Sequence, residues 1–327
     1  MIKLLRKFVF LFLLTIYIYP TPFVDNSGNI NKSAIEIINL IVPNKILNEY
    51  KKTYKDESFK IENIINLTQG RFDKKYSWMR KNERYDIKNE TPIIHLNDEK
   101  IKKIIKIFQK EDFFNSSTLS EKEVSQIKNN KNKTNVIIFG STYHSMKMKC
   151  AWIKEYFKSI KLDDKNINYI FLGGTRKLID SEIKELEKLG FKDSKDEGDM
   201  MNALSKDKNL FPNGGVNLIF EKLVPCENQK RATTMTTLNH LKKNENIIRK
   251  NEIILFVSMQ PFISRQGLMA STIFTTEENY NVISVGPGIK EKKIPKKFPD
   301  IYKEPKIQVL ILLDELSRFF YTIHKGK

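Results

Sequence analysis

The sequence predicts an α/β fold: a three-layer Rossmann-like domain with a mostly parallel sheet of about five strands, preceded by a mainly helical N-terminal extension. Three observations predict it. From residue 135 onward, short and nearly continuous apolar runs recur, which is typical of strands buried on both faces of a parallel sheet. Amphipathic segments of helix length separate these runs, which favours parallel strands joined by right-handed crossovers. The 327 residues also suffice for one domain with an extension, or for two domains.

The expected strands and helices alternate through this C-terminal part. The strands are NVIIFGS at 135–141, NYIFLGG at 168–174, VNLIFEKL at 216–223, EIILFVS at 252–258 and NVISVGP at 281–287. The helices are expected at 144–160, 180–190, 232–248, 261–274 and 304–326. The start of the last segment can also be interpreted as a sixth strand. Together these elements make up an α/β domain over residues 135–327.

The first twenty residues, MIKLLRKFVFLFLLTIYIYP, predict an export signal peptide or an uncleaved membrane anchor. Basic residues precede an uncharged apolar run from Phe8 to Tyr19, the order found in a signal segment. A helix of this length spans only about 18 Å, less than the roughly 30 Å of the hydrocarbon layer. Cleavage, anchoring and burial as an N-terminal helix all stay open. The expected location is the periplasm or the periplasmic face of the inner membrane.

Residues 21–134 are expected to form a helical or irregular extension and linker. The isoleucines of DEKIKKIIKIFQKEDFF, at 98–114, follow one helical face. Tyr76 and Trp78 could mark a small packed element. The polar stretch TLSEKEVSQIKNNKNKTN, at 118–135, is typical of an exposed linker.

The formal net charge of +18 would ordinarily indicate an anionic partner such as nucleic acid or a lipid surface. The lysines, however, are scattered through the chain, and no arginine–aromatic constellation accompanies them. A general enrichment in Lys, Asn and Ile also accounts for the charge. No nucleic-acid partner is therefore expected.

Several kinds of site are excluded by spacing. Cys150 and Cys226 could form a disulfide only if they lie close in space, and neither they nor the four histidines have the spacing of a metal site. The chain has no G-x-G-x-x-G fingerprint, no P-loop lysine and no G-x-S-x-G nucleophile motif. We therefore expect no metal, and no dinucleotide bound in the manner of that fingerprint.

The candidate site lies at the ends of the strands, because open α/β sheets bind ligands outside the carboxyl ends of their strands. Each end is small or polar. The pair Gly173 and Gly174 would let backbone N–H groups face a ligand, although any tight turn from strand to helix favours glycine. The residues at the four ends are Gly140, Ser141 and Thr142; Gly173, Gly174, Thr175 and Arg176; Glu227, Arg231, Thr233 and Thr236; and Ser258, Gln260 and Arg265.

The order of the first two strand ends resembles the SanA/ElyC/YdcF-like domain-of-unknown-function family of bacterial envelope-associated proteins. In that family one strand ends in glycine, and a second ends in Gly-Gly before a helix that begins Ser-Glu. Gly140, Gly173–Gly174 and Ser181–Glu182 match these pieces. The resemblance covers roughly residues 135–325.

The later strand ends resemble the family in part. The family pattern Glu-x-x-Ser-x-x-Thr-x-x-Asn is matched by Glu227 and Thr233, while Thr236 stands in place of Asn. A second register would use Thr233, Thr236 and a following Asn, without the Glu. The family also has a strand ending in Thr or Ser, followed by a His and an Arg. Ser258 and Arg265 match it, and the His is absent.

The resemblance implies an envelope-associated protein with a Rossmann-like ligand site, and it makes S-adenosylmethionine a candidate cofactor. Glu227 is the candidate general base, while Arg231 and Arg265 would hold a carboxylate or phosphate. Thr233 and Thr236 would contact the ligand. Two alternatives stay open: Thr233 or Thr234 only caps a helix, and Arg265 faces solvent.

The expected function is therefore that of an exported, membrane-anchored envelope protein that binds a small anionic or nucleoside-like ligand. The membrane partner would be contacted through the N-terminal segment. Whether the protein is an enzyme stays open. The alternatives are a non-catalytic scaffold with a degenerate site, and a protein whose basic surface binds an anionic membrane or polymer.

Overall fold

The computed structural model describes residues 22–25, 29–73, 76–78, 96–130, 132–163, 166–174, 176–211, 218–222, 233–244, 246–289 and 304–325. The chain divides into two compact units, Met1–Ile107 and Phe108–Lys327. The expected export segment, residues 1–20, lies outside the described residues. Over the ranges given above, no helix combines the length and the apolar character that crossing a membrane requires.

The first unit is helical, as the sequence predicts. Its elements are α2 (Lys32–Ile41), α3 (Asn44–Tyr54), η1 (Lys55–Glu57), α4 (Ile61–Thr68) and α5 (Asp98–Lys110), the last of which ends just inside the second unit. Trp78 is fully buried, and its indole Nε1–H donates to the hydroxyl of Tyr76 at 2.8 Å. This confirms the small packed element predicted there.

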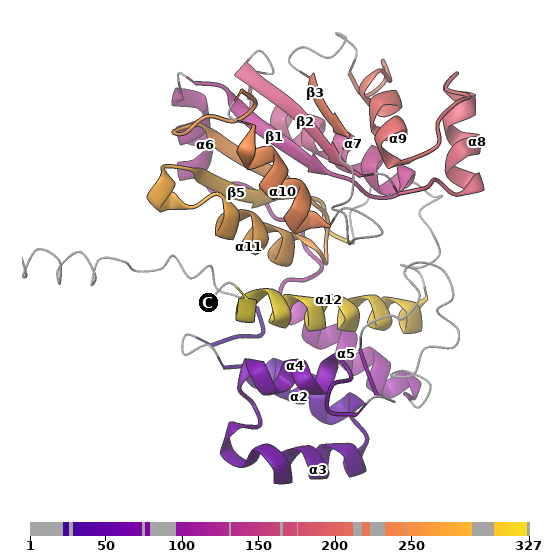
Figure 1. Cartoon of the computed structure of the whole chain (residues 1–327), viewed down its shortest axis with the longest axis vertical. Helices are drawn as coiled ribbons and strands as arrows, with labels where there is room; N and C mark the ends of the chain where they lie inside the picture. Colours follow the sequence, from indigo (N-terminus) through magenta and orange to yellow (C-terminus); the bar gives the residue numbers. More distant parts are fainter. Residues whose placement is uncertain are drawn as a thin grey trace, which may run out of the picture. The chain divides into compact units, whose positions relative to one another are not determined.

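The second unit holds the predicted sheet, which has five strands, all parallel to their neighbours (Figure 1). They are β1 (Thr134–Phe139), β2 (Ile167–Gly173), β3 (Leu218–Lys222), β4 (Ile253–Val257) and β5 (Asn281–Val285). Their order across the sheet is β3-β2-β1-β4-β5. Each predicted apolar run contains one of these strands. The runs are apolar throughout because a strand covered on both faces has no side that must be polar.

Helices cover both faces of this sheet, which makes three layers (Figure 1). Along β1, Val136 and Ile138 belong to the core beneath one helical layer, while Ile137 and Phe139 belong to the core beneath the other. This alternation is the two-residue period of a strand. One layer holds α6 (Glu121–Asn129), α7 (Tyr143–Ser159), α8 (Asp180–Lys188) and α9 (Glu197–Ser205). The other layer holds α10 (Thr234–Lys243) and α11 (Ile263–Ile273), and α12 (Pro305–Lys325) lies against α11. The short η3 (Thr276–Glu278) precedes β5. The Rossmann-like α/β fold class is confirmed.

Three details differ from the sequence prediction. The polar stretch interpreted as a linker contains α6, whose capping box pairs Ser120 with Glu123 and whose Ile127 is buried. Helix α9 was not predicted from the sequence. α12 is helical from Pro305 onward, so its start is not a sixth strand. α6 has a single buried residue and α9 is buried on nearly all sides, so neither shows a clear apolar period, and their caps are the stronger signal.

Candidate functional site

The centre of the sheet is a topological switch point. β1 and β4 are neighbours, but β1 continues through α7 to β2, whereas β4 continues through α11 to β5 on the other side. α7 and α11 cover opposite faces of the sheet. Ligands of open α/β sheets bind outside the carboxyl ends of the strands at such a point. The segments 140–142 and 258–260 follow these two strands.

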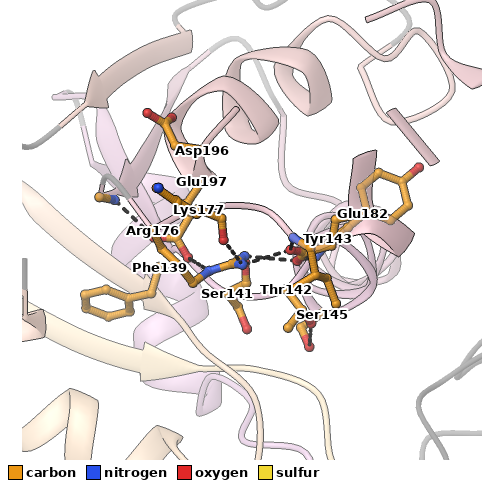
Figure 2. Close-up of polar contacts among 12 residues, drawn as sticks. Phe139, Ser141, Thr142, Tyr143, Ser145, Arg176, Lys177, Glu182, Asp196 and Glu197 are labelled. Atoms are coloured by element: carbon orange, nitrogen blue, oxygen red, sulfur yellow. Dashed lines mark hydrogen bonds and ion pairs between the residues drawn. The ribbon is translucent and has the colours of Figure 1, made fainter. Parts of the chain in front are cut away.

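Arg176 ties together the segments that follow β1 and β2 (Figure 2). Its Nη1 and Nη2 donate to the two carboxylate oxygens of Glu182 at 2.8 and 2.9 Å, which is a bidentate ion pair. Nη2 also donates to the carbonyl of Ser141 at 3.0 Å, and Nε donates to Glu197 at 3.4 Å. The Arg176 side chain is only 10% exposed. Nη1 donates in addition to the carbonyl of Lys177 at 3.0 Å, so all five N–H groups of the guanidinium have protein acceptors.

The Glu182 carboxylate occupies the starts of two helices. It accepts from the Tyr143 N–H at 3.0 Å, at the first residue of α7, and from the Ile179 N–H at 3.1 Å, just before α8. Burial alone would raise the pKa of Glu182, but hydrogen bonds from Arg176 and from these two N–H groups hold that pKa below its ordinary value. In dinucleotide-binding sheets the helix after the first strand receives a phosphate. Here a protein carboxylate binds its first N–H group.

Glu197, the first residue of α9, explains why glycines end these strands. A Cβ atom on Gly140 would lie 2.7 Å from the Glu197 carboxyl carbon, and the Gly174 N–H donates to that carboxylate at 3.0 Å. A Cβ atom on Gly173 would lie 2.2 Å from the sulfur of Met201. The absence of side chains at these positions lets α9 approach the edge of the sheet. The predicted N–H donor of Gly174 thus already has a protein acceptor.

A buried lysine lies at the same strand end. Lys149, on α7, is 2% exposed, and its amine donates to the carbonyl of Phe139, the last residue of β1. The last β1–β4 pair is Ile138 with Val257, whereas pairing between β1 and β2 continues to Phe139. The lysine therefore binds the end of β1 beyond the last residue pair with β4. Burial lowers the pKa of Lys149 to about 8, although the nearby charges of Cys150 and Glu197 oppose that shift.

Neither Glu197 nor Lys149 was predicted from the sequence as a site residue. A signal for Lys149 was present: Met146, Lys149 and Ile153 are spaced three and four residues apart, so they share the buried face of α7. A signal for Glu197 was also present, because Asp196 followed by Asp199 has capping-box spacing. The position of a lysine on an apolar helix face and of an acid in a first helical turn could therefore have indicated this cluster from the sequence.

Thr233 and Thr236 form the cap of α10. The Thr236 N–H donates to the Thr233 hydroxyl at 3.2 Å, and the Thr233 N–H donates to the Thr236 hydroxyl at 2.7 Å. The structure thus confirms the alternative interpretation for Thr233, which caps the helix, and it adds Thr236 as the partner in the capping box. Their contact with a ligand stays a prediction.

Ser258 and Arg265 lie on the other side of the switch point. The Ser258 hydroxyl donates to the Gln266 amide oxygen. Arg265 Nε donates to Glu315 of α12 at 2.6 Å, and the arginine side chain is 14% exposed. Arg265 therefore does not face solvent freely, and its cation is already paired with a carboxylate. Its role toward a ligand stays a prediction.

Three candidates, Thr175, Glu227 and Arg231, lie outside the described residues, and so does Cys226. Cys150 is buried with a free thiol, and burial raises its pKa to about 12. Within the ranges that the structure describes, no cluster of three His, Cys, Asp or Glu residues is placed to hold a metal ion.

The fold and the strand ends define the class of this protein as a Rossmann-like α/β protein. At its carboxyl edge, Arg176, Lys149, Glu182 and Glu197 form a buried cluster of charges, called the edge cluster below. Comparisons with protein-family models, with curated proteins and with solved structures found no match.

Proposed function

We propose that this protein binds a small anionic or nucleoside-like molecule at the switch point, between the segments that follow β1 and β4. The strand order β3-β2-β1-β4-β5 is the observation that carries this proposal, because it locates the switch point without reference to any motif. Ser141 and Thr142 on one side and Ser264 on the other are partly exposed, so they can offer polar groups to a ligand there.

Export, membrane anchoring and a role in the cell envelope are part of the same proposal. They rest on residues 1–20 and on the resemblance of strands and strand ends to the SanA/ElyC/YdcF-like family. The test is to fuse residues 1–30 to a reporter enzyme that is active only after export from a bacterial cytoplasm. We expect an active reporter, and an inactive one when Leu13→Arg interrupts the apolar run. Equal activity of the two fusions would contradict export through this segment.

Ligand binding is tested by calorimetric titration of the full chain with S-adenosylmethionine, with adenosine and with inorganic phosphate. Adenosine and phosphate separate the nucleoside part from the anionic part. Thr142→Tyr fills the switch point, whereas Asn281→Tyr adds a tyrosine side chain at the amino end of β5, on the opposite edge of the sheet. We expect saturable binding that Thr142→Tyr weakens at least about tenfold, a loss of about 1.4 kcal/mol, and that Asn281→Tyr leaves unchanged.

Two outcomes would contradict the proposal. Absence of binding for all three compounds would remove the nucleoside and phosphate interpretation. Binding that both tyrosine variants leave unchanged would place the ligand away from the switch point.

A non-catalytic scaffold is the second candidate, and the edge cluster favours it. Glu182 and Glu197 are held by Arg176 and by backbone N–H groups, as in a structural ion-pair network. A scaffold of this kind would retain ligand affinity without turnover. Detection of a product in the titrated mixture would exclude this candidate.

A further inference from the structure

Lys149 differs from the other cations of the carboxyl edge in what it binds. Arg176 donates to Glu182 and Glu197, and Arg265 donates to Glu315. The Lys149 amine donates to a peptide carbonyl, which carries no compensating charge. A buried ammonium without a hydrogen-bonded carboxylate is costly, and an amine responds to that cost by giving up its proton.

The amine lies at the carboxyl end of the central strand β1. Lys149 lies on the helix that begins directly after the β1 end, and side chains on a helix point back toward its start. Its amine binds the Phe139 carbonyl, directly before segment 140–142 and beyond the last residue pair of β1 with β4. The Glu197 carboxylate packs on Gly140 of this segment and acts electrostatically on the amine.

We propose that Lys149 is a reactive amine of the ligand site, which condenses with the carbonyl group of a small aldehyde or ketone to form an imine, with Glu197 as the proton relay. The inference rests on the proposed function in one respect: the carbonyl compound enters at the same switch point.

The reaction balances without an oxidant or a reductant. The unprotonated amine attacks the carbonyl carbon and forms a carbon–nitrogen bond. Glu197 takes a proton from the nitrogen and returns it to the oxygen. The oxygen leaves as water with both protons that the nitrogen has lost, and a carbon–nitrogen double bond remains.

The protonation state of Lys149 supports this chemistry. With a pKa of about 8, about half of the amine is unprotonated at pH 8. An ordinary lysine with a pKa near 10.4 is only about 0.4% unprotonated at that pH. The difference in available nucleophile is about 100-fold. Part of this advantage is offset because the amine is buried, so the probe must be small.

The test is reductive trapping with glyoxylate, a small anionic aldehyde, on the full chain at pH 7.5. Cyanoborohydride reduces each imine to a stable secondary amine, and peptide mass spectrometry gives the modification rate at every lysine. The matched controls are Lys147 and Lys158, which lie on the same helix and are partly or fully exposed. We expect Lys149 to react at least about tenfold faster than either control.

A second variant tests the role of Glu197. Glu197→Gln keeps a carbonyl oxygen that can accept the Gly174 N–H, and it gives up only the long 3.4 Å contact with Arg176, which still pairs with Glu182. The fold is therefore expected to persist at lower stability, and circular dichroism checks it. We expect the Lys149 rate to fall at least about tenfold, the scale of a lost general acid–base group, while the control lysines keep their rates. A Lys149 rate no higher than that of Lys158 would overturn the proposal.

The two proposals fail separately. Labelling of Lys149 without any binding of S-adenosylmethionine, adenosine or phosphate would keep the reactive amine and discard the nucleoside or phosphate ligand. Binding of one of these compounds at the switch point, with Lys149 no more reactive than Lys158, would discard the amine and keep the site.

Discussion

Replacement of Arg176 by alanine is expected to lower the free energy of unfolding by about 3–5 kcal/mol. The substitution leaves the carboxylates of Glu182 and Glu197 without their cation, and both side chains are largely buried, at 4% and 12% exposure. It also frees the carbonyls of Ser141 and Lys177. Chemical denaturation of the wild type and the variant at pH 7 measures the difference.

An exposed ion pair provides the control for Arg176→Ala. Lys188 and Glu185 form a pair at 2.7 Å, with the lysine side chain 63% exposed. Lys188→Ala is expected to change stability by no more than about 0.5 kcal/mol, because exposed pairs contribute little. A loss for Arg176→Ala as small as that for Lys188→Ala would contradict the role given to the edge cluster.

The pH dependence of the Arg176→Ala effect follows from Glu182. Its pKa is lowered in the folded protein, so the pair with Arg176 contributes its full stability above the unfolded-state pKa of about 4.3. The contribution is lost as pH falls through the lower folded-state pKa. The difference between wild type and variant should therefore be full at pH 7 and shrink only in acid.

Arg265→Ala should have the second large effect, about 3–4 kcal/mol at pH 7. Its partner Glu315 is 1% exposed, and burial already raises the pKa of that carboxyl even though Arg265 opposes the shift. Without the arginine, the carboxyl escapes its unpaired charge by taking a proton. From an unfolded-state pKa near 4.3, holding that proton costs about 4 kcal/mol at pH 7 and about 1 kcal/mol at pH 5.

The loss of stability for Arg265→Ala should thus diminish as the solution is acidified. A loss that came from a missing packing contact would not depend on pH in this way. The other charges near Glu315 are Asp314, which raises its pKa, and Arg318, which lowers it; these two form a pair of their own at 3.1 Å. The double variant Arg265→Met with Glu315→Leu removes both charges and should recover most of the lost stability. A loss that is constant between pH 5 and 7, or a double variant as unstable as Arg265→Ala, would contradict this account.

The fold could be predicted because its signals are local. Runs such as 135–141 and 252–258 are apolar on both faces, which is typical of a parallel strand covered on both sides. Helix α6 has only one buried residue, Ile127, which is too few for a period, and a cap is easily overlooked in a polar sequence. Helix α6 was therefore interpreted as a linker.

The candidate site could be predicted only in part. The strand-end rule identified Gly140, Gly173 and Gly174, which the structure brings together, but it did not identify what they face. The residues around an arginine in the sequence do not show whether that arginine binds a ligand or a glutamate of the same protein. Arg265 finds its partner 50 residues along the chain, and no spacing rule connects them.

The edge cluster also constrains how this protein can evolve. A single substitution at Arg176, Glu182 or Glu197 leaves a buried charge or donor without its counterpart, whereas a joint replacement by apolar side chains leaves none. The fitness effects of these positions should therefore be epistatic. Homologous chains are expected to retain the set as a whole or to have exchanged it as a whole, so these positions should covary even where the surrounding segment drifts freely.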